Sequence, residues 1–193
     1  MSARFSPHRA ATERWLSTLQ PPNRSDVLDI GSARHRGSPL ESRWRRLDLV
    51  AGPGVLQGDL RALPFRDESF SVVRCVATLH LVAELDLGLR EFQRVLRKGV
   101  GRLLLTYPLC YEDGNEQPSV RPTRGAWRRI MREIGLEAER IDPLDGAFGV
   151  LAQWLYTVGY GSRLWRGLAH AIAQYDRPGG AWTTGYGVVA VRK

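Results

Sequence analysis

The sequence has little cysteine and no long apolar run. Cys75 and Cys110 are its only cysteines, too few for a disulfide framework in a domain of this length, and they lack the spacing of a metal site. We expect both to be reduced, packed thiols. No apolar run approaches the roughly 20 residues that span a bilayer, and the N-terminal segment lacks the apolar stretch of a secretory signal. These absences predict a soluble, cytoplasmic protein without a transmembrane segment.

Lysine is also scarce, since Lys98 and Lys193 are the only two, and nearly all the positive charge behind the formal net charge of +8 is arginine. Such an excess can indicate a polyanionic partner, such as RNA or an acidic membrane surface. The arginines are dispersed, which is typical of a solvated surface. The densest cluster surrounds Trp44, with arginines at 43, 45 and 46. Nucleic-acid binding is therefore the less favoured alternative.

Histidine is sparse, and the sequence shows no metal site. His8, His35 and His170 have none of the spacings that bring imidazoles onto one ion. We therefore expect no bound metal.

The chain is 193 residues long, with 43% hydrophobic and 25% charged residues, an ordinary globular composition that favours one domain over 1–193. Short apolar segments predict strands at 27–30, 46–50, 55–57, 71–77, 102–107, 136–141 and 183–192. Helical spacing of apolar residues predicts a helix at 9–19, within the N-terminal segment 1–24, and two more at 85–96 and 126–134. Strands separated by helices or crossover loops imply an α/β fold with a mostly parallel sheet covered on both faces.

The first predicted strand ends in a carboxylate and a glycine, in the stretch DVLDIGSARHRG at 26–37. A dinucleotide-binding loop needs G-x-G-x-x-G so that backbone amides can approach a pyrophosphate, and Ala33 and Arg34 break that pattern. Asp29 would also repel a pyrophosphate, whereas it suits a ligand that carries an ammonium and a sulfonium. S-adenosylmethionine is such a ligand.

Two further strands also end in acids. Asp48 ends the second predicted strand, where a carboxylate can accept hydrogen bonds from both hydroxyls of a ribose. Asp59 follows the third strand, placed to meet an adenine amino group while Leu60 covers the ring. Because open parallel sheets bind ligands at the carboxyl ends of their strands, three acids at this edge predict one nucleoside site.

Five segments in a fixed order carry a family resemblance: VLDIGS at 27–32, LDL at 47–49, GDLRALPFRDESFSVV at 58–73, ATLHLV at 77–82 and EFQRVLRKGVGRLLLTYP at 91–108. Together they resemble the class I S-adenosylmethionine-dependent methyltransferases. The resemblance implies a Rossmann-like, seven-stranded, mostly parallel sheet with an antiparallel last strand. It makes 147–175 a helical insertion between the sixth and seventh strands.

The resemblance also implies roles for particular residues. The cofactor S-adenosyl-L-methionine would be held by Asp29, Gly31, Ser32, Asp48, Asp59, Leu60 and Ala77. The segment from Ala77 to His80 would border the methyl-transfer site, and Glu91 and Arg94 would be structural.

The chain departs from the family pattern in three places. Ala33 and His35 stand where the family loop has glycines, and we expect His35 to point away from the cofactor. The 48–59 segment is too short for the usual helix between the second and third strands, which predicts a bare loop. Ser71 replaces a frequent aspartate at a packing position.

Methyl transfer needs mainly alignment of the acceptor with the S–CH₃ bond and exclusion of water. A general base helps when the acceptor is a hydroxyl or a protonated amine, and His80 is the predicted base because its reference pKa of about 6.5 suits proton abstraction. The alternative is that His80 is a packed residue. Tyr107 and Glu84 are weaker candidates for this role, and Tyr107 is also expected on the acceptor side.

The insertion at 147–175 is rich in apolar residues at helical spacing. We expect it to form a lid over the acceptor pocket, with Trp154 and Trp165 touching a small-molecule, lipid-linked or glycan-related acceptor. The alternative is that its aromatics only pack on the sheet. Two other functions stay open, an RNA methyltransferase and a methyltransferase-like binding protein without catalysis. Oligomeric state is not encoded in any motif of the sequence.

Overall fold

The computed structural model describes residues 6–19, 26–31, 44–109, 121–158, 162–179 and 182–193. The chain divides into two compact units. We call Pro21–Tyr107, Asp113–Ile141 and Val188–Lys193 the sheet unit, and Met1–Gln20, Pro108–Glu112 and Asp142–Gly187 the helical unit. That the chain acts as one methyltransferase-like domain stays a prediction.

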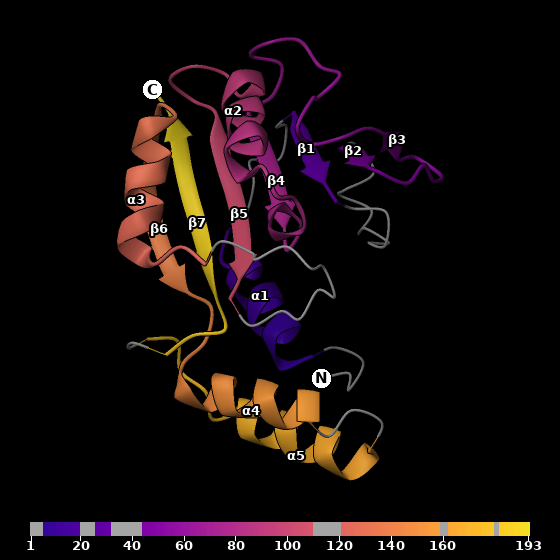
Figure 1. Ribbon diagram of the computed structural model, residues 1–193, viewed down its shortest axis with the longest axis vertical. Helices are drawn as coiled ribbons and strands as arrows, with labels where there is room; N and C mark the ends of the chain where they lie inside the picture. Colours follow the sequence, from indigo (N-terminus) through magenta and orange to yellow (C-terminus); the bar gives the residue numbers. More distant parts are fainter. Residues whose placement is uncertain (1–5, 20–25, 32–43, 110–120, 159–161, 180–181) are drawn as a thin grey trace. The chain divides into compact units, whose positions relative to one another are not determined.

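Seven strands form one sheet in the order β3-β2-β1-β4-β5-β7-β6. They are β1 (Val27–Ile30), β2 (Arg45–Asp48), β3 (Leu56–Gln57), β4 (Val72–Val76), β5 (Arg102–Pro108), β6 (Leu136–Pro143) and β7 (Gly185–Arg192). The first five strands pair in parallel, and β7 runs against β5 and β6 (Figure 1). The predicted Rossmann-like sheet with an antiparallel last strand is confirmed.

The core of the sheet unit is built from large side chains. The central strands bury Val73, Leu103 and Leu105 completely, as expected for parallel strands covered on both faces. Helix α2 (Leu85–Val95) buries Leu89, Phe92 and Val95, and helix α3 (Arg124–Glu133) buries Trp127 and Met131. Both helices turn one apolar stripe inward, which is the pattern that predicted them.

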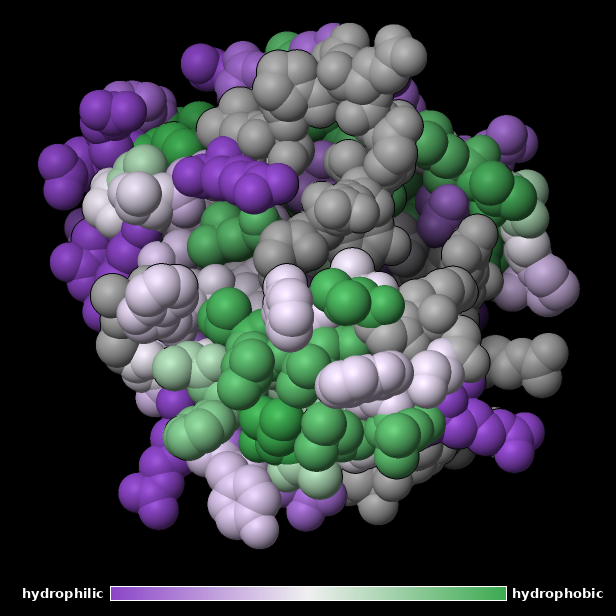
Figure 2. Space-filling view, turned by 60° about the horizontal axis from the view of Figure 1, so that its bottom comes forward, coloured by the Kyte–Doolittle hydropathy of each residue, from purple (hydrophilic) through white to green (hydrophobic). Residues whose placement is uncertain are grey.

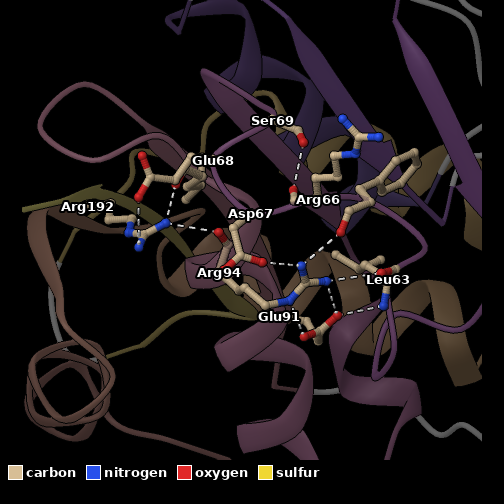
Figure 3. Close-up of polar contacts among 10 residues, drawn as sticks. Leu63, Arg66, Asp67, Glu68, Ser69, Glu91, Arg94 and Arg192 are labelled. Atoms are coloured by element: carbon tan, nitrogen blue, oxygen red, sulfur yellow. Dashed lines mark hydrogen bonds and ion pairs between the residues drawn. The ribbon is translucent and has the colours of Figure 1, made fainter.

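No helix links β2 to β3 among the described residues, as the short 48–59 segment predicts, and none links β3 to β4 in the same residues. A turn closed by the Val55 amide and the Gly52 carbonyl, 2.9 Å apart, joins β2 to β3. The segment after β3 is instead held by Arg94 of α2 (Figure 3). Its guanidinium donates to the carbonyls of Phe65 and Leu63 at 2.8 and 3.0 Å.

Two carboxylates complete this cluster. Glu91 lies 2.7 Å from Nε of Arg94 and accepts from the Leu63 amide at 2.6 Å, and Asp67 accepts from Nη1 of Arg94 at 2.7 Å. The Arg94 guanidinium is the main reason that the pKa of Glu91 lies below its ordinary value. The cluster replaces helical hydrogen bonds as the support of this loop, in agreement with the structural role expected for Glu91 and Arg94.

The helical unit contains α1 (Pro7–Ser17), α4 (Ala147–Val158) and α5 (Arg163–Ala173). The hydroxyl of Ser6 caps α1 by accepting from the Arg9 amide, and the indole N–H of Trp15 donates to Asp142 at 3.0 Å. Helices α4 and α5 lie side by side between β6 and β7 in the chain (Figure 1). The predicted helical insertion at 147–175 is confirmed, whereas its role as a lid stays a prediction.

Candidate functional site

The carboxyl ends of four neighbouring strands carry most of the predicted site residues. Gly31 follows β1, Asp48 ends β2, Asp59 lies two residues beyond β3, and Ala77 follows β4. Because β3, β2, β1 and β4 are adjacent and parallel, these ends share one edge of the sheet, where α/β folds bind ligands. Ser32 and His35 lie outside the described residues.

Gly31 is required by geometry as well as by the family pattern. Its φ is +78°, and a Cβ built on it would lie 1.9 Å from Oγ1 of Thr78. The Gly31 amide donates to the carbonyl of Leu47 at 2.9 Å, which ties the end of β1 to β2. The loops after β1 and β4 therefore come together at a point where only glycine fits.

Asp29 is buried in the middle of the sheet, with 4% of its surface exposed. Register places it opposite Arg74 of β4, and the two side chains form an ion pair with 3.4 Å between Nη1 and Oδ1. The guanidinium of Arg74 also lies 5.4 Å from the ring centroid of Trp44. Sequence reasoning missed Arg74, because nothing in the sequence fixes the register of β1 against β4.

Asp48 stands at the end of β2 with its side chain half-buried. Its Oδ1 accepts a hydrogen bond from the Val50 amide at 3.2 Å, and its own carbonyl accepts from the Gly58 amide at 2.9 Å. The first bond orients the carboxylate, and the second joins the ends of β2 and β3. The arrangement leaves Asp48 on the predicted edge, next to the segment that carries Asp59.

Asp59 is engaged by an arginine that sequence reasoning also missed. Arg61 binds its carboxylate with two nitrogens at 2.6 and 3.0 Å and reaches Glu84 at 2.8 Å. Hydrogen bonds from Arg61 hold the pKa values of Asp59 and Glu84 below their ordinary range. Both acids are therefore ionised near neutral pH. An arginine two residues after the acid was the available signal.

Leu60 is buried, and a Cβ on Gly88 of α2 would lie 2.5 Å from its Cδ1. The close approach of α2 to Leu60 thus depends on a glycine in the first half of that helix.

The β4 exit holds Ala77 and His80. Ala77 has a φ of +46°, and its amide donates to Oγ1 of Thr106 on β5 at 3.0 Å. His80 belongs to a short 3₁₀ turn, Leu79–Leu81. It is buried, and its ring meets Tyr107 edge-on with centroids 6.1 Å apart. Tyr107 packs in turn against Trp127 at 5.2 Å, so the structure brings His80 and Tyr107 together in the interior.

The remaining predicted residues lie outside the strand ends of this edge in the chain. Trp154 and Trp165 belong to α4 and α5 of the helical unit, where both are exposed. Cys75 of β4 is a buried free thiol, and burial raises its pKa to about 12. It therefore carries no nucleophilic chemistry.

Among the described residues, no group of three or more His, Cys, Asp or Glu side chains is arranged to hold a metal ion. In the same residues, no helix has the length and apolar character needed to cross a membrane.

Comparison with known proteins agrees with this geometry. A family model described as "Methyltransferase domain" matches residues 31–105. A fatty-acid O-methyltransferase of Mycolicibacterium smegmatis is 44% identical over 141 residues, which cover 68% of this chain and 51% of that protein. A malonyl-[acyl-carrier protein] O-methyltransferase of Erwinia pyrifoliae is 32% identical over 173 residues, covering 79% and 60%. The chain thus spans only half to three fifths of these curated relatives.

A solved structure supports the fold. A SAM-dependent methyltransferase from Thermotoga maritima, described as a possible histamine N-methyltransferase, superposes with a TM-score of 0.64 at 19% identity, covering 99% of this chain and 91% of that one. The matched residues 31–105 contain Gly31, Asp48, Asp59, Leu60, Ala77 and His80. Residues 31–105 therefore match a methyltransferase domain, and the chain resembles the class I S-adenosylmethionine-dependent methyltransferases in sequence over these matches and in fold.

Proposed function

We propose that this protein transfers the methyl group of S-adenosylmethionine to a carboxylate oxygen of an acyl compound, either a free fatty acid or a carrier-bound acyl group that keeps a free carboxylate, such as malonyl. The observation that carries the proposal is the match to two proteins named as O-methyltransferases of such compounds, at 44% and 32% identity. The proposal narrows the small-molecule or lipid-linked acceptor expected from the sequence.

The residues at the sheet edge fit the cofactor. The side chain of Thr78 occupies the space that a Cβ at Gly31 would fill. Because Gly31 has no side chain, the backbone after β1 can come close to a ligand. We expect Asp48 to accept hydrogen bonds from the ribose hydroxyls, and Asp59 and Leu60 to border the adenine. When bound, S-adenosylmethionine supplies an already activated methyl group, so the protein has mainly to bind, orient and exclude water.

A carboxylate acceptor also agrees with the acid–base groups near the site. Carboxylic acids with a reference pKa near 4 are ionised at neutral pH, so no base is needed to prepare the attacking oxygen. His80 would then orient the acceptor or line its site, and it would act as a base only toward a hydroxyl. The formal net charge of +8 favours the approach of anionic acceptors in general.

An RNA acceptor is less well supported, because many arginines are already engaged within the sheet unit. Ion pairs join Arg97 to Asp26 at 2.6 Å and Arg102 to Glu139 at 3.6 Å, in addition to those of Arg61, Arg74 and Arg94. A guanidinium that is paired with a carboxylate contributes less to phosphate binding, since the pair must first be broken.

The decisive experiment incubates the protein with S-adenosylmethionine and four acceptors: a fatty acid, the fatty alcohol of the same chain length, malonyl-loaded carrier protein, and RNA. Mass spectrometry detects the methylated product. We expect a methyl ester from an acid and no ether from the alcohol. Methylation of the alcohol alone would overturn the carboxylate proposal, and transfer to RNA alone would favour the RNA enzyme. Failure to bind S-adenosylmethionine in calorimetry would favour a binding protein without catalysis.

A further inference from the structure

The helices α4 and α5 bury small residues and expose large ones, which reverses the usual pattern. Their buried positions are Gly149, Ala152 and Ala169. Their exposed large apolar residues are Phe148, Leu151, Trp154, Val158, Leu164, Trp165 and Leu168. A small residue is required at position 149, because a Cβ there would lie 2.5 Å from Asp145, just before α4. The large side chains are thus left over for another contact.

These exposed side chains form a continuous surface, which we call the hairpin face. On α4 they follow one another at intervals of three or four residues, from Phe148 to Val158. On α5, Leu164 and Trp165 are followed by Leu168, one turn later. Each helix therefore presents one apolar stripe. Figure 2 shows apolar side chains gathered over this region of the molecule. Val158 and Leu164 are 67% and 78% exposed, and they belong to a group of exposed apolar residues, which is the feature that marks an interaction site.

The charged residues of the segment 147–175 indicate which kind of partner suits the hairpin face. Residues 147–175 contain two arginines, Arg163 and Arg166, and no aspartate or glutamate. The next acid along the chain, Asp176, is occupied at the start of α4, where its carboxylate accepts from the amides of Gly146 and Gly149 at 3.0 and 2.7 Å. The hairpin face is therefore apolar and cationic, without a carboxylate of its own.

This combination disfavours a second copy of the chain as the occupant, because a two-fold contact would bring these arginines together with no acid to meet them. An acidic protein would find only two arginines among many large apolar side chains. An anionic membrane surface satisfies both properties, since it accepts apolar and aromatic side chains at the acyl boundary and attracts arginine at the headgroups.

We propose that the hairpin face docks the protein on membranes containing anionic lipids, with α4 and α5 lying in the plane of the interface. Trp154, Trp165 and Tyr175, at 57%, 45% and 76% exposure, are residue types that favour this interface. Binding of this kind needs no spanning helix, because an amphipathic helix inserts only its apolar face. The proposal does not depend on the methyl acceptor.

The test is flotation of the full-length protein with vesicles of phosphatidylcholine, with or without phosphatidylglycerol, in the absence of cofactor and acceptor. The double variant Val158→Gln/Leu164→Gln is compared with Val100→Gln/Leu87→Gln. The control residues are the same types, and they are 65% and 45% exposed in the sheet unit. We expect wild type and control to bind vesicles with phosphatidylglycerol, and the hairpin variant to bind at least about tenfold more weakly, given the apolar area removed.

The charge is tested by Arg163→Gln against Arg128→Gln, an exposed arginine of α3. We expect a loss of about fivefold for the first, as is typical for one basic residue near an anionic surface, and no loss for the second. Absence of wild-type flotation, or equal losses in hairpin and control variants, would overturn the proposal. Sedimentation velocity provides the other contrary outcome. If the wild type is a dimer, the hairpin variant is a monomer and neither binds vesicles, the hairpin face would be assigned to self-association.

A negative result for membranes leaves the methyl-transfer assay unaffected, because that assay uses soluble acceptors without vesicles. Conversely, vesicle binding by a protein that methylates no acid would reject only the proposed acceptor. Melting temperatures of all variants check that exposed substitutions leave the fold intact.

Discussion

Tryptophan is used in opposite ways in helices α3 and α4 of this protein. Trp127 of the sheet unit is 0% exposed and packs edge-on against Tyr107, whereas Trp154 of the helical unit is 57% exposed. Helices α2 and α3 of the sheet unit bury large apolar side chains, whereas α4 and α5 bury only glycine and alanine. The difference supports the proposal that the hairpin face makes a contact of its own.

The largest expected effect compares these two tryptophans directly. Trp127→Ala should lower the free energy of unfolding by about 3 to 5 kcal/mol, the usual result of removing a core aromatic. Trp154→Ala should change it by less than about 0.5 kcal/mol, because an exposed side chain loses little on truncation. Chemical denaturation of both variants measures the difference. Similar losses in the two would show that Trp154 belongs to a core and that the comparison fails.

The second effect concerns the polar support of the sheet unit. Arg94→Met should cost about 2 to 3 kcal/mol, because it leaves Glu91 and the carbonyls of Phe65 and Leu63 without their charged donor. Arg97→Met is the matched control, since Arg97 forms one exposed ion pair with Asp26, and such pairs contribute about 1 kcal/mol or less. Thermal melts of both variants test the prediction, and equal shifts would reduce the Arg94 cluster to an ordinary surface ion pair.

The third prediction assigns cofactor affinity to the sheet unit. Asp48→Ala should weaken binding of S-adenosylhomocysteine by about 1.5 to 3 kcal/mol, the range for lost charge-assisted hydrogen bonds. Asp86→Ala, which removes an exposed acid in the first turn of α2, and Trp154→Ala should leave the dissociation constant nearly unchanged. Isothermal calorimetry gives all three values. An unaltered constant for Asp48→Ala would remove that residue from the site.

The order of strands and helices could be predicted from the sequence because short apolar runs and helical periodicity are local signals. The run at Val27–Ile30 is β1 without any change of bounds. Asp48 and Asp59 lie at the sheet edge as expected, whereas Asp29 lies within β1. The ion pair of Asp29 with Arg74 could not be predicted, since it depends on which residues of β1 and β4 face each other.

The exposure of the hairpin face could not be predicted from the sequence either. An apolar stripe on a helix looks the same whether it packs on a core, covers a ligand or meets a membrane, because periodicity reports only that one side of the helix is apolar. The burial of Gly149 and Ala152, which shows that the buried side of α4 carries the small residues, depends on tertiary packing. The contact of Trp154 and Trp165 with an acceptor stays a prediction for the same reason.

The smallest expected effect is a pH dependence that belongs to the helical unit. His8 is buried there with its Nδ1 2.7 Å from the hydroxyl of Thr184, which in turn donates to Asp145. Burial lowers the pKa of His8 below its ordinary value, although the nearby carboxylate of Asp145 opposes this shift. The folded protein therefore takes up this proton at a lower pH than the unfolded chain.

The sign of the effect follows from that difference. Above pH 7, His8 is neutral in both the folded and the unfolded protein, so its protonation does not change the free energy of unfolding. As the pH falls below the unfolded value of about 6.5, the unfolded state gains protons first and the folded state loses stability, by at most about 1.4 kcal/mol per pH unit for one group. Melting curves between pH 7.5 and pH 5 should show this loss in the wild type and a weaker one in His8→Gln, as the substituted amide does not titrate. A pH dependence that is the same in both proteins would mean that His8 does not control the acid stability of the helical unit.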